Sequence, residues 1–393
     1  MSDPIVIVGA QRTPMGGFQG ELSGATAAEL GAAAIGAALE RAGVPAAEVD
    51  EVLMGCVLPA GQGQAPARQA AVGAGLPESV PCTTLNKMCG SGMKAAMLAM
   101  DALRAGEGRV IAAGGMESMT NAPYILPKMR GGARLGHAEV KDHMFLDGLE
   151  DAYDKGRLMG TFAEDCAEHY QFTREEQDAY AIRSLENALA AQNDGRFDAE
   201  IAAVEIATRK GAITVGSDEQ PRTARPDKIP SLKPAFRKEG TVTPANASSI
   251  SDGAAALVLM RESEAKAAGL PLRARLLAHA SHAQAPAWFT TAPVPAMETV
   301  LARVGWQVGD VDLWEVNEAF AVVPMAAERE LGLDREKLNV NGGACALGHP
   351  IGASGARIIV TLLHALETAG LSKGVASLCI GGGEGTAVAL ERV

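Results

Sequence analysis

Hydrophobic and polar positions along the chain form short apolar runs separated by longer segments of helical period. Residues 5–8 and 110–115 are apolar runs, which predicts buried strands, and residues 49–53 (Val-Asp-Glu-Val-Leu) form a further predicted strand after a short loop. Residues 93–103 carry apolar side chains at helical spacing, and Gly106 after them marks the expected end of a helix. Strands that alternate with helices in this way indicate an α/β fold.

The same order of elements occurs twice along the chain. Gly43 and Gly305 each end a helical segment ahead of a predicted strand. Ser91 and Ser354 each open a helix after a glycine-rich loop, and the two pairs are separated by nearly the same number of residues. Self-similarity of this kind predicts two copies of one supersecondary unit packed on each other.

The two copies differ in one connection between strands. In the second copy, residues 381–385 turn directly into the last strand, residues 386–390. In the first copy, the turn begins at Gly114 and the partner strand, residues 254–260, follows only after a long insertion. We therefore expect an N-terminal half (1–118 plus 251–271), an inserted loop domain (119–250) and a C-terminal half (272–393).

The insertion combines a helical segment with a basic segment. Residues 163–192 have a helical pattern, in which Thr173 and Glu176 form a capping box. Residues 209–238 contain eight Lys or Arg residues against three acidic ones. A solvated loop and a site for a phosphate-rich ligand both fit such a segment.

Composition limits the classes of function. The chain has 393 residues, of which 47% are hydrophobic and 21% charged, as in a soluble globular protein with a large core. Its formal net charge of −12 argues against nucleic acid or an anionic membrane as a partner. The six cysteines show no metal-ligand spacing, and we see no secretory signal or membrane-spanning run. We expect reduced cysteines, no bound metal and a cytoplasmic location.

Cys89 is the first candidate for chemistry. It stands in the segment of residues 86–95, where Gly90 and Gly92 place it at or just before a helix N-terminus. Peptide dipoles at that position favour an anion, so we expect the pKa of the thiol to be lowered. A small, inert cysteine packed in a tight turn is the alternative.

Three other residues stand at the ends of predicted elements. His349 lies in the loop of the second copy that matches the Cys89 loop, and matching loops of a duplicated fold face each other. His349 and Cys89 are therefore a candidate base and nucleophile, although a His-Pro loop also suits a structural histidine. Cys379 ends a strand beside glycine N–H groups, including that of Gly381, that can hold an oxyanion. Asn317 ends another strand and is an uncharged donor.

At these positions the chain resembles the thiolases, the acyl-CoA:acetyl-CoA C-acyltransferases, over essentially its whole length. The resemblance is carried by residues 86–95, 114–119, 240–255, 317–320, 348–355 and 379–383. It implies a duplicated five-layer α-β-α-β-α fold and reversible Claisen condensation or thiolysis. It also implies acetyl-CoA and 3-ketoacyl-CoA as substrates, no further cofactor, and a homotetramer built from dimers.

The resemblance implies a role for each candidate. Cys89 is the nucleophile, His349 takes its proton, and Cys379 removes the α-proton of acetyl-CoA. Asn317 holds a water that forms one oxyanion hole with His349, and the N–H groups of Cys89 and Gly381 form another. The residues implied to contact the acyl and CoA parts of the substrate are Ser248, Phe236, Leu149, Met159, Arg222, Phe289 and Phe320. The strand after the Cys89 helix is implied to be an edge strand at the dimer interface, and residues 122–143 to form a tetramerisation loop.

The chain departs from the thiolase pattern at a few positions. Leu158 stands where short-chain members carry a histidine, Trp288 and Phe289 replace smaller or unbranched residues, and Glu384 follows the triple glycine. Leu158 makes the acyl pocket more apolar, whereas an inward-pointing Phe289 takes up its volume, so we expect short-chain substrates. The alternatives are a longer-chain thiolase of fatty-acid oxidation, a ketoacyl synthase with a different set of partners for its cysteine, and a non-catalytic acyl-CoA-binding relative.

Overall fold

The computed structural model describes residues 3–393, and its largest element is one ten-stranded sheet. Its order is β12-β13-β14-β11-β1-β10-β5-β3-β4, with β2 beside β10. The strands are β1 (Ile5–Arg12), β2 (Gly16–Gly17), β3 (Glu51–Gly55), β4 (Cys82–Leu85), β5 (Val110–Ser118), β10 (Ser251–Arg261), β11 (Ala274–Ala283), β12 (Leu313–Val316), β13 (Lys373–Ile380) and β14 (Glu384–Arg392).

The pairing within the sheet confirms the duplication. In the N-terminal half, β3 runs parallel to β5, which pairs antiparallel with β10. In the C-terminal half, β12 runs parallel to β13, which pairs antiparallel with β14. The two halves meet where β1 pairs antiparallel with β11. We did not predict β11, because its alternating buried and half-exposed positions include polar residues that weaken the apolar signal.

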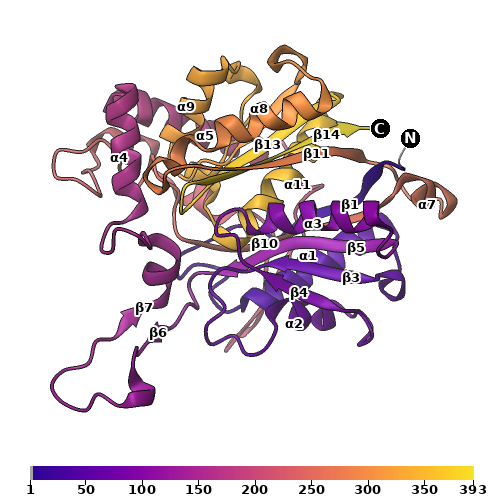
Figure 1. Cartoon of the computed structure of the whole chain (residues 1–393), viewed down its shortest axis with the longest axis horizontal. Coiled ribbons are helices and arrows are strands. Elements are labelled where there is room, and N and C mark those ends of the chain that lie inside the picture. Colours follow the sequence, from indigo (N-terminus) through magenta and orange to yellow (C-terminus); the bar gives the residue numbers. More distant parts are fainter. Residues whose placement is uncertain (1–2) are drawn as a thin grey trace.

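Helices cover the sheet in layers and confirm the five-layer fold (Figure 1). Helices α3 and α11 pack against each other and against strands of both halves, where they share one apolar cluster with β1, β5, β13 and β14. Helix α1 covers the outer face of the N-terminal half, and α8 packs on β11 and β14 of the C-terminal half. The helices are α1 (Ala27–Ala42), α2 (Pro66–Gly73), α3 (Ser91–Ala105), α4 (Met159–Tyr170), α5 (Arg174–Asn193), α6 (Glu219–Thr223), α7 (Glu262–Ala267), α8 (Pro293–Val304), α9 (Val322–Leu331), α10 (Ala344–Leu347) and α11 (Ile351–Ala369).

Helix ends follow the local sequence signals. Gly106 after α3 and Gly370 after α11 adopt φ angles of 89° and 66°, the left-handed conformation that glycine allows at a helix end. Thr173 caps α5 through the predicted box with Glu176. The helical character predicted for residues 163–192 is confirmed, and it is divided between two helices: α4 ends, the chain turns at Gln171, with φ 56°, and Thr173 starts α5.

The long insertion lies between β5 and β10 and sends an arm away from the body of the molecule (Figure 1). The arm contains the short pair β6 (Tyr124–Ile125) and β7 (Lys141–Asp142), and a second hairpin is formed by β8 (Val204–Thr208) and β9 (Gly211–Val215). Tyr124 and Leu135 of the arm are 69% and 92% exposed. None of the helices within residues 3–393 has the length and apolar character needed to cross a membrane.

The edge-strand prediction needs correction. The strand after the Cys89 helix is β5, and it lies inside the sheet between β10 and β3. The edge beyond β3 is formed by β4, which comes before that helix in the chain. Sequence order suggested the wrong strand because the connection from β4 through α3 to β5 skips over β3.

Candidate active site

Cys89 lies in a tight loop that contacts the end of β13. Met88 has a φ of 47°, and α3 begins at Ser91 with Gly90 as its N-cap, so Cys89 lies just before the helix as predicted. A Cβ atom on Gly90 would lie 2.4 Å from Cδ1 of Ile380, so a side chain there would separate the Cys89 loop from the end of β13. Glycine at this position therefore lets the loop contact the end of β13.

His349 is held in one tautomer by a serine. Its Nδ1 atom lies 2.6 Å from Oγ of Ser354, and that hydroxyl donates to the carbonyl of Pro350 at 3.0 Å. Because the hydroxyl proton is already used, Nδ1 must carry a proton and Nε2 keeps its lone pair. Nε2 is buried and has no hydrogen-bond partner within residues 3–393. His349 is thus set up as a neutral base.

Most predicted site residues line one cavity of about 340 Å³. Cys89, His349 and Gly381 lie in its wall, so the two matching loops do face each other. The predicted substrate contacts that line it are Ser248, Phe236, Leu149, Met159, Phe289 and Phe320. Sequence reasoning did not name other wall residues, among them Met88, Met119, Gly148, Ile250 and Ala319. They have no chemical signature of their own and reach the cavity only through the fold.

Aromatic rings close one wall of the cavity. Phe289 is only 3% exposed, and its ring lies 6.5 Å from that of Phe320 and 6.3 Å from that of Phe162, centroid to centroid. Leu158, which stands where short-chain thiolases carry a histidine, also lines the cavity. The side chain of Phe289 points into the cavity, as the expectation of short-chain substrates requires.

Two predicted site residues, Cys379 and Asn317, are buried and are not among the residues that line the cavity. Cys379 is fully buried, two residues before Gly381, and its pKa is raised well above that of an ordinary thiol by burial and by the neighbouring charge of Cys89. The backbone N–H of Asn317 donates to the carbonyl of Ser377 at 2.9 Å. Its side-chain amide is buried, and neither amide atom has a partner within residues 3–393. Buried amides are normally hydrogen-bonded, so this one suits a water or a substrate oxygen.

Arg222 lies apart from the cavity. It is half exposed, and its guanidinium pairs with Glu21 at 2.6 Å. The basic segment instead supplies Arg225 and Lys228 to a second cavity of about 280 Å³, and Pro244 lines both cavities. The excess of basic residues in the sequence indicated this region, and a contact of Arg222 with a CoA phosphate stays a prediction.

The prediction of a lowered thiol pKa was wrong. Burial raises the pKa of Cys89 to about 11, and the backbone N–H groups of Gly381 and Cys89 offset only part of that effect. None of the residues that line the cavity in the described chain is Lys or Arg, so no cation favours the thiolate. Burial, and then the charge of Arg357, lower the pKa of His349 to about 3. The resting pair is therefore a neutral thiol and a neutral imidazole.

Comparisons with known proteins agree with this geometry. The family profile described as Thiolase, N-terminal domain matches residues 5–263, and that described as Thiolase, C-terminal domain matches residues 270–392. The chain is 52% identical to an acetyl-CoA acetyltransferase of Pseudomonas aeruginosa and 51% identical to one of Cupriavidus necator, with 99% of each chain covered. The crystal structure of the Bacillus anthracis acetyl-CoA acetyltransferase superposes with a TM-score of 0.97 at 44% identity, covering 100% of this chain and 99% of that one. The chain belongs to the thiolase family.

Proposed function

We propose that this protein is an acyl-CoA:acetyl-CoA C-acyltransferase that condenses or cleaves short-chain 3-ketoacyl-CoA through an S-acyl-Cys89 intermediate. The observation that carries the proposal is the convergence of Cys89, the free Nε2 of His349 and Gly381 on one largely apolar cavity. The named relatives are acetyl-CoA acetyltransferases that match the chain over nearly its full length, which supports the same reaction here.

The first half-reaction forms the acyl-enzyme. Sγ of Cys89 attacks the thioester carbonyl while its proton moves to Nε2 of His349. Because the thiol has a pKa of about 11, this proton transfer accompanies the attack. The N–H groups of Cys89 and Gly381 stabilise the oxyanion. The bond from the acyl carbon to the sulfur of CoA then breaks, and CoA leaves as a thiol with the proton of Cys379.

The second half-reaction forms the carbon–carbon bond. The thiolate of Cys379 takes the α-proton of a bound acetyl-CoA, and protonated His349 and a water on Asn317 stabilise the enolate oxygen. The enolate carbon attacks the acyl carbon on Cys89, and the bond from that carbon to Sγ breaks. Protonated His349 returns its proton to the departing sulfur of Cys89, so the enzyme regains its starting state and 3-ketoacyl-CoA is released.

Substrate length follows from the shape of the cavity. The inward-pointing Phe289 occupies the volume that extra methylenes would need, and overpacking costs about 1–3 kcal/mol, more than the ~0.8 kcal/mol that each buried methylene gains. We therefore assign acetoacetyl-CoA and its nearest homologues as substrates. The cavity with Arg225 and Lys228 provides positive charge for the phosphates of CoA.

We further propose a homotetramer built from dimers, acting in fatty acid metabolism in the cytoplasm. Exposed apolar side chains on the arm, led by Leu135 and Tyr124, give a second copy a surface to bury. The free edge of β4 is available for pairing with a partner strand.

A substrate panel tests the proposed reaction. The purified enzyme should cleave acetoacetyl-CoA in the presence of CoA, with kcat/KM falling as the 3-ketoacyl chain grows from four to sixteen carbons. Condensation with malonyl-ACP as the only donor would identify a ketoacyl synthase and contradict the proposal. A kcat/KM that rises steadily with chain length would favour a longer-chain thiolase and contradict the assigned substrate range.

A further inference from the structure

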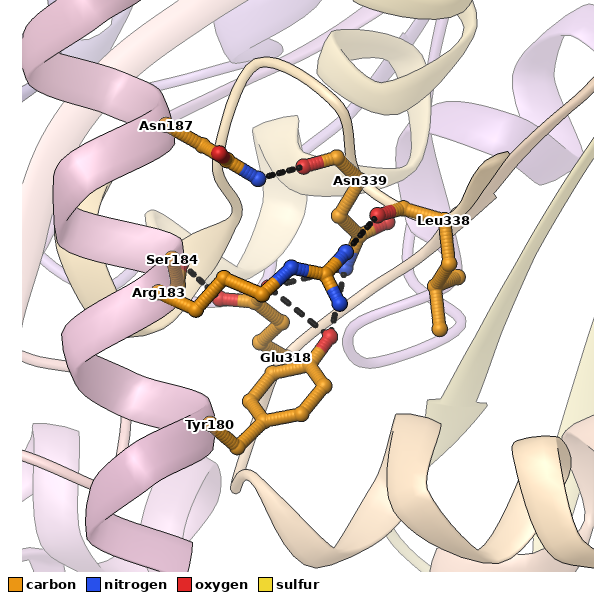
Figure 2. Close-up of a pocket in the computed structure, with 7 residues that line it drawn as sticks. All are labelled: Tyr180, Arg183, Ser184, Asn187, Glu318, Leu338 and Asn339. Carbon is orange, nitrogen blue, oxygen red and sulfur yellow. Dashed lines mark hydrogen bonds between the residues drawn. The ribbon is translucent and has the colours of Figure 1, made fainter. Parts of the chain in front are cut away.

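The residue that follows Asn317 in the chain, Glu318, carries a buried carboxylate. Glu318 is fully buried and accepts four hydrogen bonds, of which Figure 2 shows those from Tyr180, Ser184 and Asn339. Its Oε1 atom accepts from the hydroxyl of Tyr180 at 3.1 Å and from Nδ2 of Asn339 at 2.8 Å. Its Oε2 atom accepts from Oγ of Ser184 at 2.7 Å and from the backbone N–H of Cys345 at 3.0 Å. These partners come from α5 of the insertion and from the loop that leads to His349.

The same network fixes the end of β12 just before Asn317. The side chain of Asn339 accepts from the N–H of Val316 and donates to its carbonyl, each at 2.9 Å. Asn339 itself has a φ of 48°, a strained conformation that needs support from its surroundings. Glu318 supplies that support through Nδ2 of Asn339. Asn317 thus lies between Val316, whose backbone Asn339 holds, and Glu318, whose carboxylate holds Asn339.

The fit around Glu318 is close on its other side too. A Cβ atom on Gly343 would lie 2.2 Å from the carboxyl carbon of Glu318, so this glycine makes room for the carboxylate. The N–H of Gly343 donates to Oγ of Ser184 at 3.0 Å. The motif of residues 317–320 and the segment 339–343 therefore pack together with α5.

Only an acceptor suits this position. The N–H of Cys345 and the amide nitrogen of Asn339 both donate and cannot accept, and they contact different oxygens of Glu318. Burial, followed by the charge of Glu318, raises the pKa of Tyr180 well above its usual value, so the phenol keeps its proton and donates. A glutamine would turn its NH2 group toward one of the fixed donors in either orientation. Within residues 3–393 no Lys or Arg forms an ion pair with Glu318, so its role is not that of a structural salt bridge.

We propose that Glu318 is the positioning residue for Asn317, whose amide it holds in register with Nε2 of His349 for the enolate-forming step. This inference rests on the proposed function. The first half-reaction uses the N–H groups of Cys89 and Gly381, which the carboxylate does not touch. Loss of Glu318 should therefore slow the second half-reaction selectively.

The test compares the two half-reactions in Glu318→Gln. Acylation of Cys89 by acetyl-CoA is followed by intact mass in a single turnover, and exchange of the acetyl α-protons with deuterium is followed by NMR. We expect acylation within twofold of the wild type and exchange slower by about ten- to a hundredfold, as for a misplacement of about 1 Å. In an Asn317→Ala background the second substitution should add little, because its target is already absent.

Two controls separate positioning from general stability. Glu164→Gln alters another buried carboxylate that accepts only from neutral groups, those of Thr241 and Val242. It should lower Tm without slowing one half-reaction more than the other. If Glu318→Gln does not fold, Ser184→Ala keeps the carboxylate and removes one donor, and it should slow exchange in the same selective way.

Equal slowing of both half-reactions in Glu318→Gln would overturn the inference while leaving the reaction assignment intact. So would a double variant with Asn317→Ala in which Glu318→Gln slows exchange by as much as it does in the wild-type background. Failure of the wild-type enzyme to acylate at all would instead overturn the proposed function.

Discussion

Removing the hydroxyl that sets the tautomer of His349 should slow acylation of Cys89. In Ser354→Ala, the Nδ1–H group loses the acceptor that now lies 2.6 Å away and would remain buried without a partner. His349 lines the cavity, so a proton on Nε2 can be donated to a water there, whereas a proton on Nδ1 has no acceptor left. The tautomer with the proton on Nε2 is then favoured, and its lone pair can no longer accept the proton of Cys89. Leaving a buried donor unsatisfied costs about 1–3 kcal/mol, so the productive tautomer is disfavoured by that amount.

This free-energy cost corresponds to a rate loss of about 5- to 150-fold, since each 1.36 kcal/mol is a factor of ten. The assay is the single-turnover rate constant for acylation by acetyl-CoA, measured by rapid quench. Ser377→Ala is the matched control, because Ser377 is also fully buried and donates to a backbone carbonyl, that of Thr386 at 2.8 Å, without touching His349. Acylation of Ser354→Ala within twofold of the wild type, or an equal loss in Ser377→Ala, would refute the tautomer argument.

Three further predictions concern the thiol, the acyl pocket and the arm. Alkylation of Cys89 by iodoacetamide should rise about tenfold per pH unit through neutrality, because the thiolate fraction grows with pH up to a pKa of about 11; a plateau near pH 7 would indicate a resting ion pair with His349 instead. Phe289→Ala should raise kcat/KM for longer 3-ketoacyl-CoA by about fourfold per added methylene, from ~0.8 kcal/mol each, and an unchanged chain-length profile would exclude Phe289 as the limit. Replacing the exposed Tyr124 and Leu135 by Glu should yield dimers in light scattering with acylation intact, and a persistent tetramer would show that the arm is not the contact.

Signals that act within a few residues could be read from the sequence. The capping box at Thr173 and the helix ends at Gly43, Gly106 and Gly305 were predicted because they depend on local backbone conformation. The convergence of Cys89 and His349 was predicted from the duplication, which supplies a long-range relation that a single copy lacks.

Properties that depend on the surroundings of a residue were missed. The helix N-terminus suggested a lowered pKa for Cys89, but desolvation by burial is the larger effect, and burial is set by residues from across the chain. The ion pair between Arg222 and Glu21 was not predicted, because Glu21 belongs to a distant part of the sequence. Ser354 was visible in the segment after His349, but its contact with Nδ1 depends on how α11 begins.

Formation of the acyl-enzyme tests the central claim most directly. Intact-mass analysis after incubation with acetyl-CoA should show one added acetyl group on the wild-type protein and on Cys379→Ala, and none on Cys89→Ser. Cys379→Ala should form the adduct more slowly, because CoA then leaves as a thiolate without the proton of Cys379. It should keep the adduct because it lacks the base for the second half-reaction, and its α-proton exchange should be lost. An acetyl adduct that persists in Cys89→Ser would show that another residue is the nucleophile and would contradict the account.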